Sequence, residues 1–210
     1  MTHLVLLRHG ESQWNLENRF TGWVDIPLSP KGELEARTAG EKLRKYKFTK
    51  GYTSVLQRAI KTLDIVLGIT GQSDLAVERD QALNERHYGA LQGKNKAEIG
   101  SQYGEAQLKL WRRSYDVPPP KDRTELNPEG ISESLKDTAA RTLPYFQSKI
   151  LPDVMAGKHV IVAAHGNSLR SIVMHLDGLT KEQVIELNIP TGAPLLYTYN
   201  DGKIVEHRYL

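Results

Sequence analysis

Leu4-Val5-Leu6-Leu7-Arg8-His9-Gly10-Glu11-Ser12 is an apolar run that ends in a histidine, a glycine and polar side chains. Val160-Ile161-Val162-Ala163-Ala164-His165-Gly166-Asn167-Ser168 repeats that arrangement near the other end of the chain. Continuous apolar runs of this length, bounded by glycine and polar residues, are typical of parallel strands buried on both faces. Ligands bind beyond the carboxyl ends of such strands, so we expect His9 and His165 at the mouth of one α/β sheet.

Composition excludes several classes of protein. The 210 residues suit one domain, 1–210, large enough for a sizeable core, and cysteine is absent, which removes disulfides and thiolate chemistry. The net charge of +3 comes from scattered basic residues, which favours a small anionic substrate over a nucleic acid. No segment has the apolar length of a membrane span and the N-terminus does not resemble a signal peptide, so we expect a cytoplasmic protein without membrane contact.

Periodicity and turn signals place the remaining elements. Helices are expected from Ser29-Pro30 to Tyr46, over 56–67, over 94–113, over 135–150, over 168–176, and after Thr180. Gly68 or Gly71 would end the second helix, Gly100 and Gly104 would break the third, and Pro144 would kink the fourth. Strands are expected at 3–9, 51–54 and 75–78, with a hairpin of 194–199 and 203–209 around Asn200-Asp201-Gly202. Segments 10–27 and 84–93 are interpreted as loops, and the proline-rich segment 118–131 as either a lid or an ordered surface loop.

The chemistry-bearing residues around His9 favour an anion site. Gly10 lets the backbone approach a ligand, while Arg8, Arg58 and the pair Arg112-Arg113 carry planar guanidinium groups that fit phosphate oxygens. Taken singly, a histidine at a strand end is more often structural, and an arginine is more often solvated. The joint arrangement shifts the interpretation toward phosphate.

Glu85 is the candidate proton carrier, because it lies in a polar loop where a carboxyl group could both donate and accept a proton. The alternative is a surface glutamate paired with Arg86. A metal site is the competing use of the two histidines, but neither HExxH nor CxxC spacing is present, and nearby arginines would repel a cation.

The motifs of this chain resemble those of the histidine phosphatase superfamily, and specifically its cofactor-dependent phosphoglycerate mutases. The resemblance covers almost the whole chain and implies a three-layer α/β sandwich, with a mostly parallel central sheet and helices on both faces. It is carried by 7–15, Phe20-Thr21-Gly22-Trp23, Arg58-Ala59, 84–93, Trp111-Arg112-Arg113-Ser114, 164–170 and Leu187-Asn188-Ile189-Pro190-Thr191-Gly192.

The resemblance also implies a role for each matching residue. His9 would be the phosphorylated nucleophile, Glu85 the proton donor and acceptor, and His165 the group that stabilises the phosphoryl group in transit. Arg8 and Arg58 would complete the catalytic set. Substrate binding would fall to Gly10, Glu11, Ser12, Gln13, Trp14, Asn15, Thr21, Gly22, Arg86, His87, Tyr88, Lys96, Arg112, Arg113, Gly166 and Asn167.

The implied reaction interconverts 3-phosphoglycerate and 2-phosphoglycerate, with 2,3-bisphosphoglycerate as primer and no metal. Arginines and a second imidazole would neutralise the charge of the phosphoryl group in transit. Two rival functions remain open at this point. One is a broad histidine phosphatase, in which water accepts the phosphate, and the other is a phosphate-binding regulatory module without catalysis.

Two departures from the resemblance bear on assembly. The segment between Pro118-Pro119-Pro120 and Ser134 is short, and the sequence stops at Leu210 without a Lys/Ala-rich tail. We therefore expect a monomer or a weak homodimer. A site without such a tail would be more open to water, so measurable hydrolysis of 2,3-bisphosphoglycerate is expected.

Overall fold

The computed structural model describes residues 1–210 and contains one six-stranded sheet in the order β3-β2-β4-β1-β5-β6. The first four strands of that order run parallel, whereas β5 runs antiparallel to β1 and to β6. The predicted α/β class and mostly parallel sheet are confirmed. The strands are β1 (Thr2–Arg8), β2 (Lys50–Thr53), β3 (Val77–Arg79), β4 (Val160–Ala164), β5 (Pro194–Asn200) and β6 (Lys203–Tyr209).

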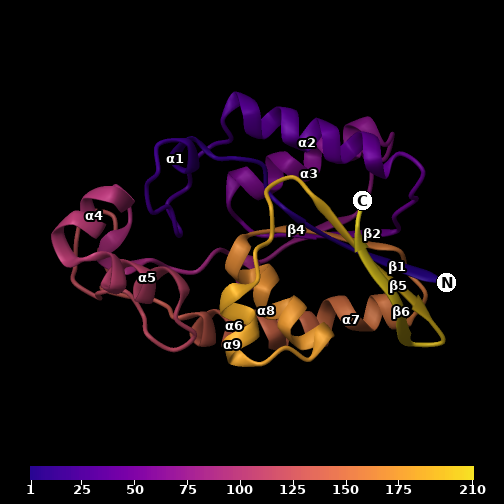
Figure 1. Cartoon of the computed structure of the whole chain (residues 1–210). Helices are drawn as coiled ribbons and strands as arrows, with labels where there is room; N and C mark the ends of the chain where they lie inside the picture. The colour runs from indigo at the N-terminus through magenta and orange to yellow at the C-terminus, as the bar shows by residue number, and fades with distance from the viewer.

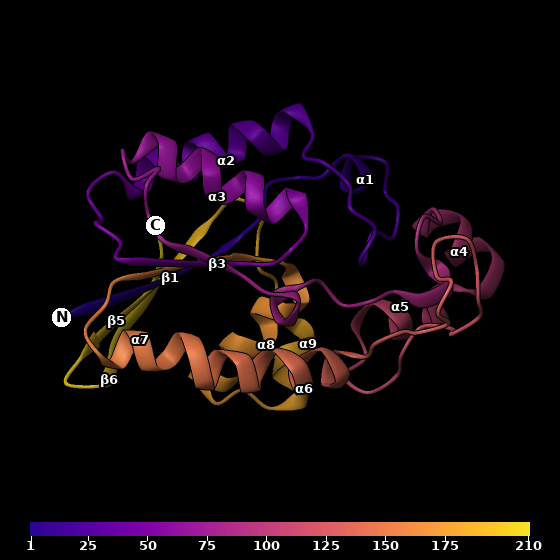
Figure 2. The same cartoon turned by 180° about the vertical axis from the view of Figure 1, so that it is seen from behind.

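Helices cover both faces of this sheet, as the three-layer expectation required. Figures 1 and 2 show α2 and α3 on one face, α6 to α9 on the other, and α4 and α5 projecting beyond one end. The helices are α1 (Gln13–Leu16), α2 (Pro30–Leu43), α3 (Gln57–Ile69), α4 (Lys96–Tyr103), α5 (Glu105–Arg113), α6 (Leu135–Tyr145), α7 (Leu151–Met155), α8 (Gly166–Asp177) and α9 (Lys181–Glu186).

Strand β1 is apolar throughout its centre because it is buried on both faces. Leu4 and Leu6 pack in the core beneath α6 and α8, while Val5 and Leu7 pack in the core beneath α2 and α3. Successive side chains of a strand point to opposite faces, so an unbroken apolar run is what a central strand requires. Each fully buried leucine contributes about 1.5–3 kcal/mol, which fixes this strand at the middle of the sheet.

The register between β1 and β4 brings the two histidines together. Arg8 and Ala164 form the last residue pair of the parallel ladder, and the residue that follows each strand is a histidine. The His9 amide still donates to the Ala164 carbonyl at 3.0 Å, which holds the two chains side by side at the point where they leave the sheet. The expectation that both histidines stand at one sheet mouth is confirmed.

Helices α4 and α5 form a small lobe with a core of its own. Phe20, Leu91, Ile99, Leu108 and Trp111 are buried together there. Residues 118–131 form an ordered surface loop beside it, because the Pro120 carbonyl accepts from the Ala90 amide at 2.9 Å and Leu126 accepts from Gln92 at 2.7 Å. Of the two interpretations of this segment, the structure supports the ordered loop.

Several local predictions need correction. Residues 13–16 of the expected loop form α1, because Ser12 and Asn15 make a capping box. Gly100 does not break the helix: its open side receives Glu105 and Leu108 of α5, and only Gly104, at φ +87°, ends α4. Beyond Pro144 the helix continues as a π turn over 146–150 into α7. The predicted strand at 75–78 lies at 77–79, and the helix predicted to reach Tyr46 ends at Leu43.

Candidate active site

His9 is held as a neutral ring with one nitrogen free. Its Nδ1 lies 2.6 Å from the Gly10 carbonyl oxygen, which can only accept, so Nδ1 carries the proton and Nε2 keeps a free lone pair. Burial lowers the pKa of His9 well below its ordinary value, and the nearby charges of Arg58 and Arg8 lower it further. A ring that is neutral at neutral pH, with its second nitrogen fixed by an acceptor, is the form that attacks phosphorus.

His165 faces His9 across the mouth of the sheet. The two ring centroids are 5.0 Å apart and the rings are tilted by 60°. Its Nε2 is hydrogen-bonded to the Ser54 hydroxyl at 2.7 Å, whereas its Nδ1 is buried without a partner. Burial lowers the pKa of His165 well below its ordinary value, and the charge of Arg58 lowers it further. An added anion between the rings would give this second imidazole the partner it lacks.

Unpartnered donors converge on the same place. Arg8, Arg58 and Thr21 line the cavity that holds His9, and the Nε atoms of both arginines and the Thr21 hydroxyl are buried without hydrogen-bond partners. Buried donors left unpaired cost about 1–3 kcal/mol each unless something meets them. Burial lowers the pKa of Arg58 to about 10, so it remains charged at neutral pH. This end of the cavity is therefore built for a tetrahedral anion.

Backbone contacts hold the guanidinium groups in place. Arg58 donates to the Gly22 and Val24 carbonyls at 2.7 and 3.0 Å, and Arg8 donates to the Ile189 carbonyl at 2.8 Å. These bonds use the terminal nitrogens and leave each Nε free. The loop that carries Thr21 is thereby tied to the start of α3.

Glu85 lies in the wall of this cavity and is only 8% exposed. Its Oε1 accepts from the Arg86 amide at 2.7 Å and from the Asn167 amide at 3.1 Å. The Arg86 side chain turns away to the Glu133, Trp111 and Val117 carbonyls. The alternative of an exposed Glu85–Arg86 pair is therefore not what the structure contains.

A second, strongly basic half adjoins the first. Arg8, Glu85, Tyr88 and Lys96 line both halves, so the two form one continuous hollow. Burial lowers the pKa of Lys96 to about 8, and the charges of Arg112 and Arg8 add to the effect. The residues found only in the second half are Arg112, Arg113, Gly166, Asn167, Arg170 and Asn188.

Fourteen of the sequence-predicted residues surround the two histidines and the hollow. Thirteen line it: Arg8, His9, Asn15, Thr21, Gly22, Arg58, Glu85, Tyr88, Lys96, Arg112, Arg113, Gly166 and Asn167. His165 lies against His9 behind them. Their individual roles stay predictions, but their convergence from six separate segments is a property of the fold.

The other predicted binding residues lie outside the lining. Glu11 accepts from the Ser29 hydroxyl at 2.8 Å at the start of α2, Ser12 caps α1, and Gln13 bonds Glu17 on the surface. The remaining ones also make contacts within the protein. Gly10 lies against the backbone of Gly32, and Trp14 lies beneath Arg19. Arg86 donates to the carbonyls of Trp111, Val117 and Glu133, and His87 bonds Glu133 and Gly89.

Sequence reasoning missed several residues at the site. Ser54, which directly follows β2, bonds His165, and Arg170 follows Asn167 by about one helical turn and donates to its side-chain oxygen at 3.2 Å. The helical spacing was a usable signal for Arg170, whereas the place of Ser54 depended on the pairing of β2 with β4. Arg19, Phe20 and Asn188 complete the set.

The donor set around the histidines suits an anion. No three His, Asp, Glu or Cys side chains gather where they could hold a metal ion. The groups that face the rings are guanidinium groups, which belong to the chemistry of phosphate. No helix has the length and apolar character needed to cross a membrane.

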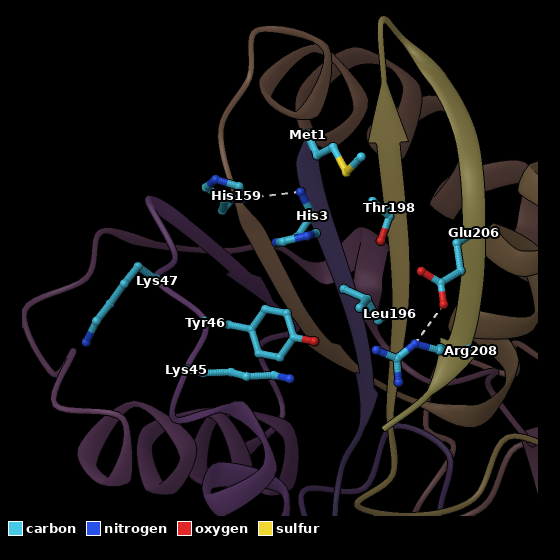
Figure 3. A pocket seen from close by; sticks show the side chains of 10 residues that line it. All are labelled: Met1, His3, Lys45, Tyr46, Lys47, His159, Leu196, Thr198, Glu206 and Arg208. Atoms are coloured by element: carbon cyan, nitrogen blue, oxygen red, sulfur yellow. Dashed lines mark hydrogen bonds and ion pairs between the residues drawn. The ribbon is translucent and has the colours of Figure 1, made fainter.

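A larger hollow lies at the other end of β1. It has a volume of about 490 Å³ and is lined by His3, His159, Lys45 and Arg208, among others. Figure 3 shows Arg208 paired with Glu206 and His3 bonded to His159 through its amide. His3 and His9 lie at opposite ends of β1, and no residue that lines this hollow also lines the cavity that holds His9.

Sequence comparison places this arrangement in a known family. A profile of the histidine phosphatase superfamily (branch 1) matches residues 4–209, and the chain belongs to that superfamily. A 2,3-bisphosphoglycerate-dependent phosphoglycerate mutase of Nitratidesulfovibrio vulgaris (strain DSM 19637 / Miyazaki F) is 54% identical over 229 residues, covering 100% of this chain and 92% of that protein.

Solved structures share the fold. A mycobacterial glucosyl-3-phosphoglycerate phosphatase in complex with VO3 superposes with a TM-score of 0.78 at 27% identity, covering 100% of this chain and 97% of that one. YhfR of Bacillus stearothermophilus has a TM-score of 0.78 at 26% identity, covering 97% and 94%. These likenesses confirm the fold that the resemblance implied.

Proposed function

We propose that this protein is a 2,3-bisphosphoglycerate-dependent phosphoglycerate mutase, which interconverts 3-phosphoglycerate and 2-phosphoglycerate through a phosphorylated His9. The observation that carries the proposal is the two-part hollow. One half holds a neutral imidazole among unpartnered cationic donors, and the other holds Lys96, Arg112, Arg113 and Arg170. A glycerate with a phosphate at one end and a carboxylate or second phosphate at the other matches both halves.

The chain's own residues account for each step of the transfer. A hydroxyl of the bound phosphoglycerate attacks the phosphorus on His9, the P–N bond breaks, and its electron pair returns to Nε2. Glu85 takes the hydroxyl proton as the new P–O bond forms. In the reverse sense, Nε2 attacks the other phosphate, the P–O bond breaks, and Glu85 returns the proton to the leaving oxygen.

Charge neutralisation is supplied by fixed groups. Arg8, Arg58 and the Nδ1 of His165 would face the equatorial oxygens, since their donors are buried and unpartnered. The residues also fit the primer, because its two phosphates and its carboxylate have cationic partners in both halves. When bound, 2,3-bisphosphoglycerate supplies the phosphoryl group that loads His9.

The test is a mutase assay with and without the primer, combined with labelling. Incubation of the wild-type protein with phosphate-labelled 2,3-bisphosphoglycerate is expected to give an acid-labile protein label, and His9→Ala is expected to give none. Activity that ignores the primer, or label that survives in His9→Ala, would refute the proposal.

The relatives also include a phosphatase, so hydrolysis is the second candidate function. The basic second half of the hollow favours the mutase, because a phosphatase with water as acceptor does not need a clamp for a second anionic group. We expect slow hydrolysis of 2,3-bisphosphoglycerate as a side activity. A hydrolysis rate above the mutase rate would reverse the assignment.

Domain organisation, assembly and location complete the proposal. We propose one domain over 1–210, a monomer or weak homodimer, and a cytoplasmic location with phosphoglycerates as the partners. The two larger cores lie against the two faces of the same sheet, which supports a single domain. Sedimentation that shows a stable tetramer at low concentration would refute the assembly.

A further inference from the structure

Arg141 on α6 sends its guanidinium to the loop that carries Glu85. Its Nη1 donates to the Ala82 and Asn84 carbonyls at 2.9 and 3.1 Å. Its Nη2 donates to the carbonyl of Glu85 itself at 2.8 Å. One side chain thus holds the backbone on the amino side of the proposed proton carrier.

Glu133, at the start of α6, holds the other side. Its Oε2 accepts from the His87 amide at 2.9 Å, and its own amide donates to the His87 carbonyl at 2.9 Å. Its carbonyl accepts from Arg86 Nε at 2.7 Å. Arg141 and Glu133 are joined by two hydrogen bonds of 2.7 and 2.8 Å, so the two side chains hold the Glu85 loop as one unit.

Trp23 ties this unit to the loop that carries Thr21. The indole Nε1 donates to the Glu85 carbonyl at 2.5 Å, and the Arg141 guanidinium lies 5.3 Å from the centre of the Trp23 ring. Both side chains of the ion pair are largely buried, at 20% and 15% exposure, so solvent screens their attraction only in part. Only arginine offers a planar fork with enough donors for two carboxylate oxygens and several carbonyls together.

We propose that Arg141, held by Glu133, is a positioning residue that fixes the backbone of Glu85 so that its carboxyl group meets the substrate oxygen. The inference rests on the proposed function, since it assumes that Glu85 moves a proton. Neither side chain lines the hollow, so their contacts reach it through the backbone of the Glu85 loop. A displacement of about 1 Å at a reacting group costs on the order of a hundredfold in rate, so such a brace matters for the chemistry.

Two phosphoryl donors distinguish a positioning role of Arg141 from a general structural role. Transfer from 2,3-bisphosphoglycerate to His9 releases an alkoxide oxygen that needs the proton of Glu85. Transfer from p-nitrophenyl phosphate releases a phenolate that leaves without one, and water then hydrolyses the phosphohistidine. A variant that misplaces only Glu85 therefore slows the first reaction and spares the second.

The experiment measures phosphorylation of His9 by both donors in Arg141→Gln. We expect the rate from 2,3-bisphosphoglycerate to fall by about 10- to 100-fold and the rate from p-nitrophenyl phosphate by less than about threefold. Arg141→Lys keeps the charge but lacks the planar guanidinium group, so its rate with 2,3-bisphosphoglycerate should lie between those of wild type and Arg141→Gln. Glu133→Gln keeps an acceptor for the His87 amide and should show the same selectivity, which provides a second variant if Arg141→Gln folds poorly.

Arg44→Gln is the matched control, because Arg44 also makes a two-pronged pair with a glutamate, Glu41, on the exposed side of α2. It should leave both rates unchanged. Equal losses with both donors in folded Arg141→Gln and Glu133→Gln would overturn the inference. Glu85→Gln is the reference: if it shows no donor selectivity, the proton role of Glu85 fails and the inference fails with it, whereas selectivity in Glu85→Gln alone overturns only the brace.

Discussion

At the scale of single residues, the site is governed by which donors the fold leaves without partners. In His9, Nδ1 is hydrogen-bonded to the Gly10 carbonyl and Nε2 is free, whereas in His165, Nε2 is hydrogen-bonded to Ser54 and Nδ1 has no partner. Both rings have lowered pKa values because they are buried among arginines. The arginines that add to this effect of burial also supply positive charge of the kind that a phosphoryl group needs.

Ser54→Ala tests the support of His165. The hydroxyl fixes the ring at 2.7 Å, and a positioning hydrogen bond is worth about 1 kcal/mol, so kcat should fall by roughly fivefold to tenfold with little change in KM. Ser148→Ala, which removes an exposed hydroxyl at the π turn, is the control and should behave as wild type. Initial rates with 3-phosphoglycerate measure both, and an unchanged kcat in Ser54→Ala would contradict the assigned contact.

Lys96 gives the hollow a pH dependence on the alkaline side. Its pKa is lowered to about 8, so it is charged below that pH and neutral above it. Anionic substrate should therefore bind less well as pH rises, and kcat/KM should decline above about pH 8, since this ratio reports the free enzyme. Lys96→Arg should remove the decline because arginine stays charged, and a profile that is the same in both proteins would exclude Lys96 as its source.

At the scale of elements, close contact between backbones places the loop after β1. The Gly10 amide donates to the Thr62 hydroxyl of α3 at 3.1 Å, and Gly10 lies directly against Gly32 in the first turn of α2. A Cβ on Gly32 would stand 2.0 Å from the Glu11 carbonyl oxygen, a distance no side chain can occupy. The glycine thus sets how tightly α2 closes on the segment that begins at His9.

Gly32→Ala is expected to move that segment. The added methyl group should lower the free energy of unfolding by about 1–3 kcal/mol, as other overpacked sites do, and should lower kcat as well. Gly68→Ala in α3 is the matched control, because nothing lies within 4 Å of its added Cβ. It should raise the free energy of unfolding by about 0.5–1 kcal/mol, and urea midpoints for the two variants should therefore shift in opposite directions.

At the scale of the whole molecule, the two buried histidines, His9 and His165, weaken the fold in acid. Their pKa values are lowered in the folded state, so between those values and about 6.5 the unfolded chain binds more protons. The stability associated with the neutral rings is complete above pH 6.5 and is lost as pH falls toward the folded pKa values. Each ring adds up to about 1.4 kcal/mol of lost stability per pH unit in that window.

Urea unfolding at several pH values below neutrality measures this slope. Wild type should lose stability steeply with falling pH, and His165→Gln should show a shallower slope, whatever its absolute stability, because one titrating ring is gone. Ser148→Ala, which removes an exposed hydroxyl that does not titrate, is the control and should keep the wild-type slope. Equal slopes in wild type and His165→Gln would contradict the assigned burial of a neutral ring.

The sequence by itself determined the α/β class, the two central strands, the hairpin and most of the residues that line the hollow, because apolar runs and turn residues are local signals. Its errors were local as well. Gly100 predicts a helix break, but in the structure Glu105 and Leu108 pack into the space where a side chain at this position would lie. Glu11, Arg86 and His87 carry the right chemistry in the right motifs, yet their partners are other protein groups.

Only the tertiary structure decided the partners. Arg170 reaches the site because it lies one helical turn after Asn167, and Ser54 reaches it because β2 pairs with β4. Arg141 reaches the Glu85 loop from α6, far away in the sequence. Whether two groups form a hydrogen bond depends on a few tenths of an ångström in the distance between donor and acceptor, and a pattern of residues in the sequence does not contain that information. The sequence therefore specified which chemistry the chain carries, and packing specified which of those groups face the hollow and which hold it in shape.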